Sequence, residues 1–109
     1  MIVNVCPAAT TKAPPDRIWR VIAATDRYGD WTDAAVLRVD PPGPAQAGQV
    51  IWMGGWALGR RWRFPIDVAD VDPQHRWIDL VVHLPFGITN HERLTLTDTN
   101  DGGTLVRFN

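Results

Sequence analysis

The chain has 109 residues, which fits one domain built on one hydrophobic core. Its 11 basic and 12 acidic residues give a formal charge of −1, which argues against a general electrostatic affinity for nucleic acid or anionic membranes. A single cysteine cannot form an intrachain disulfide, which fits a reducing compartment, and we expect the cytoplasm. No apolar run approaches the roughly 20 residues that span a bilayer, so no stable membrane insertion is expected.

Residues 13–31 carry the only convincing helical pattern. We expect a helix over Pro14–Thr25, because two prolines suit a first turn whose N–H groups have no helical partner. Its apolar stripe recurs at helical spacing and consists of Ile18, Val21, Ile22 and Thr25, widened by Trp19. A second short turn is expected over Asp26–Tyr28, ended by Gly29. One helix of about three turns cannot fold alone, so it must pack on a sheet.

The rest of the chain alternates like β-structure. Strands are expected over Ile2–Thr10, Ala34–Asp40, Gln49–Met53, Leu58–Val71, His75–Leu84, Ile88–Thr97 and Thr104–Phe108. The segments between them are rich in turn-forming residues, with a bend expected at Gly54-Gly55 and a hairpin turn at Asn100–Gly103. Consecutive strands joined by such turns predict an antiparallel meander.

The alternation also assigns strand faces. In the longest strand, Trp62, Phe64 and Ile66 share one face with Arg60. The opposite face carries Arg61, Arg63 and Asp67, which we interpret as solvated. In the second strand, Ala35, Leu37 and Val39 are expected to share a face.

The order and spacing of several segments point to a family. A first strand is followed by APPDRIWRVIAATDRYGDWT, a connection ending in AGQV, then FPIDVADVDPQHRW and DGGTLVRF. Over nearly the whole chain this resembles the polyketide cyclase/dehydrase and lipid-transport family of the START-like (SRPBCC) superfamily. The resemblance implies an α+β helix-grip fold, a curved antiparallel sheet of about six or seven strands with short N-terminal helices after the first strand. It also implies a cavity for hydrophobic small molecules.

The sequence departs from the family pattern at its end. Family members continue into a long C-terminal helix that covers the cavity, whereas this sequence stops at Asn109. Residues 1–109 are therefore interpreted as a single START-like domain that is shortened at its C-terminus. We expect part of the apolar sheet face to be uncovered, and self-association or a partner subunit to cover it. The expected uncovered residues are Trp62, Phe64, Ile66, Ile78, Leu80, Val82, Leu94 and Leu96.

The candidate ligand-binding residues are large apolar side chains of the expected concave face and its rim. They are Trp52, Trp56, Trp62, Phe64, Ile66, Ile78, Leu80, Val82 and Leu94. Trp52 and Trp56 flank the Gly54-Gly55 pair and are plausible gates of a cavity, with ordinary packing as the alternative reading. No cofactor is expected.

Two charged residues share the inward face and are the candidate catalytic groups. Arg60 could hold a carboxylate or enolate oxygen, and Glu92 could act as an acid or base. The alternatives are that both lie in solvent at strand ends or pair with each other. His83 is a further acid–base candidate, although its register places it on the outer face.

No metal site is expected, because His75, His83 and His91 are spaced eight residues apart, with no cysteine or ligand-type pairing near them.

Three functions remain open at this point. The first is binding of a small hydrophobic or aromatic, lipid-like or polyketide-like ligand. The second is a polyketide cyclase, aromatase or dehydratase in which the pocket orients the substrate. The third is an interaction subunit that docks a partner on the uncovered sheet face. The binding hypothesis is preferred because no nucleophile–base set is legible, and a fold alone does not decide function.

Overall fold

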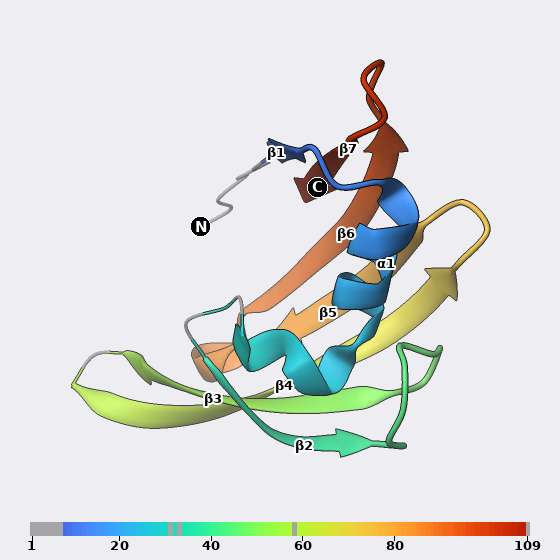
Figure 1. The fold of residues 1–109 in the computed structure, drawn as a ribbon. Helices are drawn as coiled ribbons and strands as arrows, with labels where there is room; N and C mark the ends of the chain where they lie inside the picture. The colour runs from blue at the N-terminus through green and yellow to red at the C-terminus, as the bar shows by residue number, and fades with distance from the viewer. Residues whose placement is uncertain (1–7, 31, 33, 58, 109) are drawn as a thin grey trace.

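The computed structural model describes residues 8–30, 32, 34–57 and 59–108. Within them, seven antiparallel strands form one curved sheet with two short helices on its inner side (Figure 1). The elements in chain order are β1 (Ala8–Thr11), α1 (Pro15–Ala23), the 3-10 helix η1 (Thr25–Asp30), β2 (Ala35–Asp40), β3 (Val50–Ala57), β4 (Arg60–Asp72), β5 (Trp77–His83), the 3-10 turn η2 (Pro85–Gly87), β6 (Thr89–Asp98) and β7 (Thr104–Phe108).

The strand order is β1-β7-β6-β5-β4-β3-β2, so β2 to β7 form a meander and β1 adds to its last strand. β1 and β7 join the two ends of the described chain, with Thr10 opposite Leu105. This confirms the expected curved antiparallel sheet. Of the strand predicted over Ile2–Thr10, only the last three residues lie within the described part of the chain.

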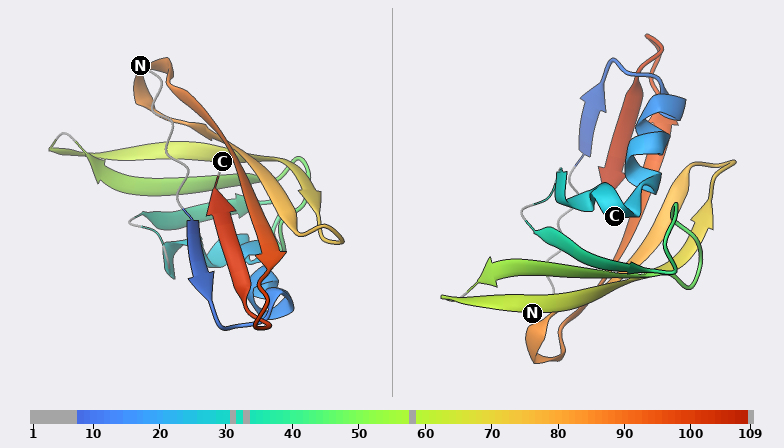
Figure 2. Two further views of the ribbon diagram at one scale, coloured as in Figure 1. Left: turned by 90° about the horizontal axis from the view of Figure 1, so that it is seen from above. Right: turned by 60° about the horizontal axis from the view of Figure 1, so that its bottom comes forward.

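The sheet bends so that both of its ends, β1–β7 and β2–β3, come round to the side that carries α1 and η1 (Figures 1 and 2). The hydrophobic core lies between the helices and this concave face. It consists of Ile22 and Tyr28 from the helices and Ile51, Met53, Ile66, Val68, Ile78, Leu80, Leu94 and Leu96 from the strands. The Tyr28 hydroxyl donates a hydrogen bond to the Ile22 carbonyl oxygen at 2.8 Å, which ties η1 to α1. No described helix is long and apolar enough to cross a membrane.

The helical stripe is narrower than predicted. Ile22 is buried and Ile18 and Trp19 pack against the core, but Val21 is 50% exposed. The helix ends at Ala23, and the Thr25 hydroxyl donates to the Gly43 carbonyl oxygen at 3.3 Å. The helix therefore ends two residues before the predicted end at Thr25. Thr25 begins η1 and is nevertheless fully buried, as its place in the stripe predicts.

Two strand predictions were wrong. β3 runs straight through Gly54 and Gly55, which pair with Arg63 and Trp62 of β4, so the expected bend is absent at these described positions. In β2 a bulge between Val36 and Arg38 shifts the register. Since a bulge inserts an extra residue, the alternation changes phase and Leu37 is exposed, away from the core face.

The expected uncovered face is mostly covered. Ile66, Ile78, Leu80, Leu94 and Leu96 are buried, in the core that the two helices complete. Only Trp62, Phe64 and Val82 of that set stay half-buried. The helices after the first strand therefore cover more of the concave face than the sequence indicates.

Candidate functional site

An apolar pocket of about 260 Å³ lies where the β3–β4 hairpin meets the β5–β6 connection. Its walls come from two segments that are far apart in the sequence. They are Gly55 and Trp56 of β3, Trp62 and Phe64 of β4, and Leu84, Pro85, Phe86 and Ile88 around η2. Every described lining residue is apolar or glycine, so this site can hold an apolar body through contact and desolvation.

The β3–β4 ladder creates the first wall. Gly55 pairs with Trp62, and Met53 pairs with Phe64, so these four positions share the inward face. Gly55 leaves space beside the Trp62 indole because it has no side chain. A Cβ atom placed at Gly55 would meet only the Ala34 Cβ, at 3.8 Å, which is an ordinary contact distance.

The second wall is the turn η2, which presents Phe86. Its phenyl ring lies 5.5 Å from the Trp62 indole in an edge-on arrangement with an interplanar angle of 63°. Phe86 has a φ of 66°, a left-handed conformation that is unusual for a bulky residue, and the residue is 79% exposed. The turn is closed by the Leu84 N–H, which donates to the Ile88 carbonyl oxygen at 2.8 Å. Such a costly conformation often occurs at binding sites.

Three of the predicted ligand-binding residues line this pocket, namely Trp56, Trp62 and Phe64. Four others, Ile66, Ile78, Leu80 and Leu94, are buried core residues, and Val82 is half-buried beside them. The sequence reading missed the η2 side of the site. The sequence predicts only a turn over residues 85–87, between the strands that end at Leu84 and begin at Ile88, although the large apolar residues of this run are a signal of a binding surface.

Trp52 lies on the other face of the sheet. It pairs with Pro65, whereas its neighbours Ile51 and Met53 point into the core. Trp52 is 38% exposed and borders a shallow outer groove with Leu37, Arg38 and Arg63. Trp56 has the same alternation as Trp52, but near the end of the hairpin it lines both the apolar pocket and an outer groove.

Two arginines flank the pocket. The Arg60 guanidinium carbon lies 4.5 Å from the centroid of the Trp62 ring, and that of Arg61 lies 5.8 Å from the Trp56 ring. Both distances fit cation–π contacts. Both side chains are exposed, and neither forms an ion pair with another described residue.

Glu92 lies away from Arg60. It is half-buried on β6 opposite Leu80, which in turn lies opposite Val68 of β4. Arg60 precedes Val68 by eight residues on β4, a span of about 26 Å along a strand. The Asn90 side-chain amide donates to the Glu92 carboxylate at 2.9 Å. The structure therefore does not bring the two candidate catalytic groups together.

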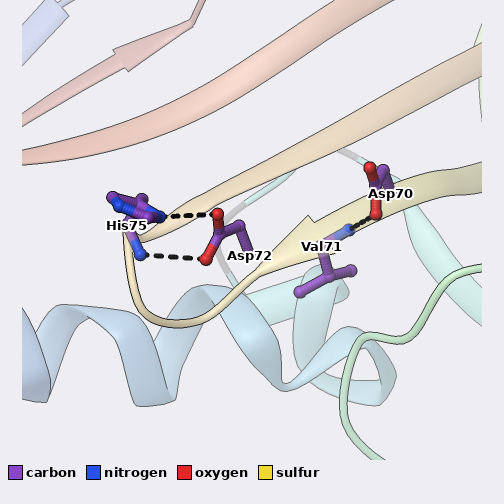
Figure 3. Close-up of polar contacts among 4 residues, drawn as sticks. All are labelled: Asp70, Val71, Asp72 and His75. Atoms are coloured by element: carbon purple, nitrogen blue, oxygen red, sulfur yellow. Dashed lines mark hydrogen bonds and ion pairs between the residues drawn. The ribbon is translucent and has the colours of Figure 1, made fainter.

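The histidines have local roles. His83 Nε2 lies 2.7 Å from an Asp67 carboxylate oxygen, both on the outer face of the sheet. His75 contacts Asp72 twice, through its backbone N–H at 3.0 Å and its Nδ1 at 2.7 Å, and so closes the β4–β5 turn (Figure 3). These bonds, the backbone N–H first, lower the pKa of Asp72. Among the described residues, no group of three His, Cys, Asp or Glu side chains is placed to hold a metal ion.

The comparisons with known proteins concern the fold. No protein-family model matches the chain, and no curated protein matches it significantly in sequence. Protein Ms6760 from Mycobacterium smegmatis is similar in structure, with a TM-score of 0.68 and 18% identity over 94% of this chain and 68% of that one. Ara h 8.0201 matches with a TM-score of 0.71 and 14% identity, over 95% of this chain and 72% of that one. ChR145 from Cytophaga hutchinsonii has a TM-score of 0.62 and 14% identity, with 99% and 77% covered.

At these identities the similarity shows the fold alone. Ara h 8.0201 has the Bet v 1-like fold of the START/SRPBCC superfamily. The curved, unclosed seven-stranded sheet is compatible with that helix-grip-like architecture, which the sequence resemblance also implies.

Proposed function

We propose that the chain binds a small hydrophobic or aromatic molecule in the apolar pocket. The observation that carries the proposal is the cluster of exposed apolar side chains around it. Trp56 is 70% exposed, Phe86 79% and Ile88 53%, and all three border one concave site. Large apolar side chains gathered beside a pocket are typical of binding sites, whereas scattered ones are not. The volume of about 260 Å³ lies just below the roughly 300–1,000 Å³ of drug-sized ligand pockets, so it suits a small aromatic body.

The fold supports the same class of function. Hydrophobic ligand binding is common in the START-like superfamily that the sequence resembles, and the Bet v 1-like neighbour agrees with this at the level of the fold. In this chain the deeper part of the concave face is filled by the core residues Ile78 and Leu94. The proposed ligand therefore lies at the end of the face near η2, away from the sheet centre.

A neutral fluorescent probe, N-phenylnaphthylamine, tests the proposal. Gly55→Val places a branched side chain in the pocket without a backbone clash, and β-branched residues suit a strand. We expect this variant to keep its fold and to bind the probe about tenfold more weakly than the unaltered chain.

The matched control is Gly54→Val, which adds the same group on the outer face. There the nearest atom is Leu37 Cδ1 at 3.2 Å, on an exposed side chain that can move. The control should bind the probe like the unaltered chain. Equal affinity of all three proteins, with circular dichroism spectra unchanged, would show that the probe binds elsewhere or that the pocket is not a site.

A polyketide cyclase or dehydratase that uses Arg60 and Glu92 is a weaker proposal. The half-buried position of Glu92 on the inner face favours it, but a separation of about eight strand positions prevents both groups from acting on one small substrate. Glu92→Gln should therefore leave the affinity for the probe unchanged. If the unaltered chain turns over a polyketide substrate and this variant does not, the enzyme hypothesis would be supported.

Self-association through the exposed residues Trp56, Phe86 and Ile88 is the third candidate. It predicts a mass that rises with concentration in light scattering and a shift to monomer in Phe86→Ala. A constant monomer mass over a wide concentration range would contradict it.

A further inference from the structure

The mouth of the apolar pocket is basic. The two stretches that supply its walls, residues 41–66 and 80–91, contain no aspartate or glutamate, although the chain has 12 acidic residues. The first stretch holds Arg60, Arg61 and Arg63 within four positions. The near-neutral charge of the whole chain therefore hides a concentration of arginines on the β3–β4 wall of the pocket.

Arg60 and Arg61 differ from other arginines of the protein in their partners. Arg27, Arg38, Arg76 and Arg93 each form an ion pair with an aspartate. Arg60 and Arg61 lie against the indole rings of Trp62 and Trp56, which line the pocket, and form no ion pair within the described residues. Arg93 also lies over an indole ring, that of Trp77 at 4.1 Å, while its N–H groups bind Asp79. A guanidinium that lies against a ring uses its planar face for that contact, so the N–H donors at its edge remain available for an anion.

We propose that the ligand of this pocket is an apolar molecule with one anionic group, and that Arg60 binds this group. The inference rests on the proposed function, since the apolar body of the ligand occupies the pocket that Trp62 and Phe86 both line. Arg60 contacts the ring of Trp62, so an anion at the edge of that indole meets its N–H groups. The anion remains at the solvent-exposed mouth, where its charge keeps part of its hydration.

A matched pair of probes tests the proposal. Anilinonaphthalene sulfonate differs from N-phenylnaphthylamine by one sulfonate group. We expect the unaltered chain to bind the sulfonate probe about fivefold more tightly than the neutral one, as suits an exposed charge-assisted contact. Arg60→Gln should remove this preference without changing the affinity for the neutral probe. Arg63→Gln, on the same strand and facing outward, is the matched control and should keep the preference.

The outcomes separate the two proposals. If the neutral probe fails to bind, the proposed pocket itself fails. If the neutral probe binds and Arg60→Gln leaves the preference for the sulfonate intact, the pocket stands and the anionic ligand class is overturned. The preference should also shrink between low salt and about 1 M salt, because exposed charge contacts are screened.

Anionic amphiphiles occur both as free molecules and as membrane lipids. A second experiment, with lipid vesicles, distinguishes these two sources of the ligand. Cosedimentation with vesicles of phosphatidylglycerol and phosphatidylcholine measures the membrane source. Binding of the monomeric probe without cosedimentation supports a free ligand. Cosedimentation that Arg60→Gln abolishes supports the same anion site with a lipid as its source. Vesicle binding that is unaffected by Arg60→Gln, together with equal affinity for both probes, overturns the proposal.

Discussion

Replacing Phe86 by glycine tests whether this residue contributes mainly to the stability of the fold or to ligand binding. Phe86 has a φ of 66°, and a non-glycine residue in that region costs about 1–2 kcal/mol, which glycine relieves. Against this gain, glycine loses about 0.5–1 kcal/mol through the greater freedom of the unfolded chain. The edge-on contact with Trp62 contributes about 1 kcal/mol, and the small buried part of the phenyl ring contributes a similar amount.

These terms partly cancel, so Phe86→Gly should lower the free energy of unfolding by about 0.5–2 kcal/mol. Binding of N-phenylnaphthylamine should weaken about tenfold, because the variant lacks one aromatic wall of the pocket. Urea unfolding followed by circular dichroism measures the first quantity, and fluorescence titration measures the second. A loss of more than about 3 kcal/mol in stability with unchanged probe affinity would refute the reasoning, since it would make Phe86 a structural residue.

Three further predictions concern the scaffold. Gly103→Ala should destabilise the chain by about 3 kcal/mol in urea unfolding, because the added Cβ would collide with the Thr11 carbonyl oxygen and disturb the β1–β7 pairing. The control Gly102→Ala places its Cβ in open space, so it should lose less stability, by an amount set by the positive φ of this residue. Leu94→Ala should cost about 3 kcal/mol in the same assay, because this fully buried side chain would leave a cavity, and a loss below about 1 kcal/mol would contradict its place in the core. Burial raises the pKa of Tyr28, so its neutral form stabilises the fold below pH 10.0 and this contribution falls as the pH rises further. In an absorbance titration, this only tyrosine of the sequence should ionise together with unfolding. Ionisation near pH 10.0 in a chain that stays folded would contradict the burial.

The sheet could be predicted because its strands alternate and its turns carry strong local signals. β7 was predicted over the residues that the structure shows, since Asn100–Gly103 fixes its start. The strand predicted at Gln49–Met53 ends too early, because Gly54 and Gly55 have a low strand propensity. In the structure, pairing with β4 extends β3 through both glycines. Local propensity cannot represent such long-range pairing.

The site was predicted in part for a related reason. Alternation places Trp62 and Phe64 on the inward face, and the structure agrees. The same alternation places Trp52 on the opposite face from Ile51 and Met53, so the sequence could have predicted its outward position. Alternation assigns each residue to a face but does not give the register between different strands. The sequence therefore could not show that Arg60 of β4 and Glu92 of β6 lie far apart.

The contribution of η2 was hidden in the sequence because it depends on tertiary placement. Phe86 belongs to the connection between β5 and β6. The β4–β5 register pairs Ile66 with Val82, and continued by four residues it brings Phe86 opposite Trp62 of β4. A left-handed φ at this phenylalanine has no local sequence signature other than the glycine that follows it.

The most direct test of the central claim is a map of amide and indole chemical shifts during titration with N-phenylnaphthylamine. The account predicts shifts confined to residues 54–64 and 84–88, including the indole N–H signals of Trp56 and Trp62. Signals of Ile78, Leu94 and Leu96 should stay in place, because these residues form the core beneath α1 and η1. Shifts centred on the core or on Trp52 of the outer face, or no saturable shifts, would contradict an apolar binding pocket between the β3–β4 hairpin and η2.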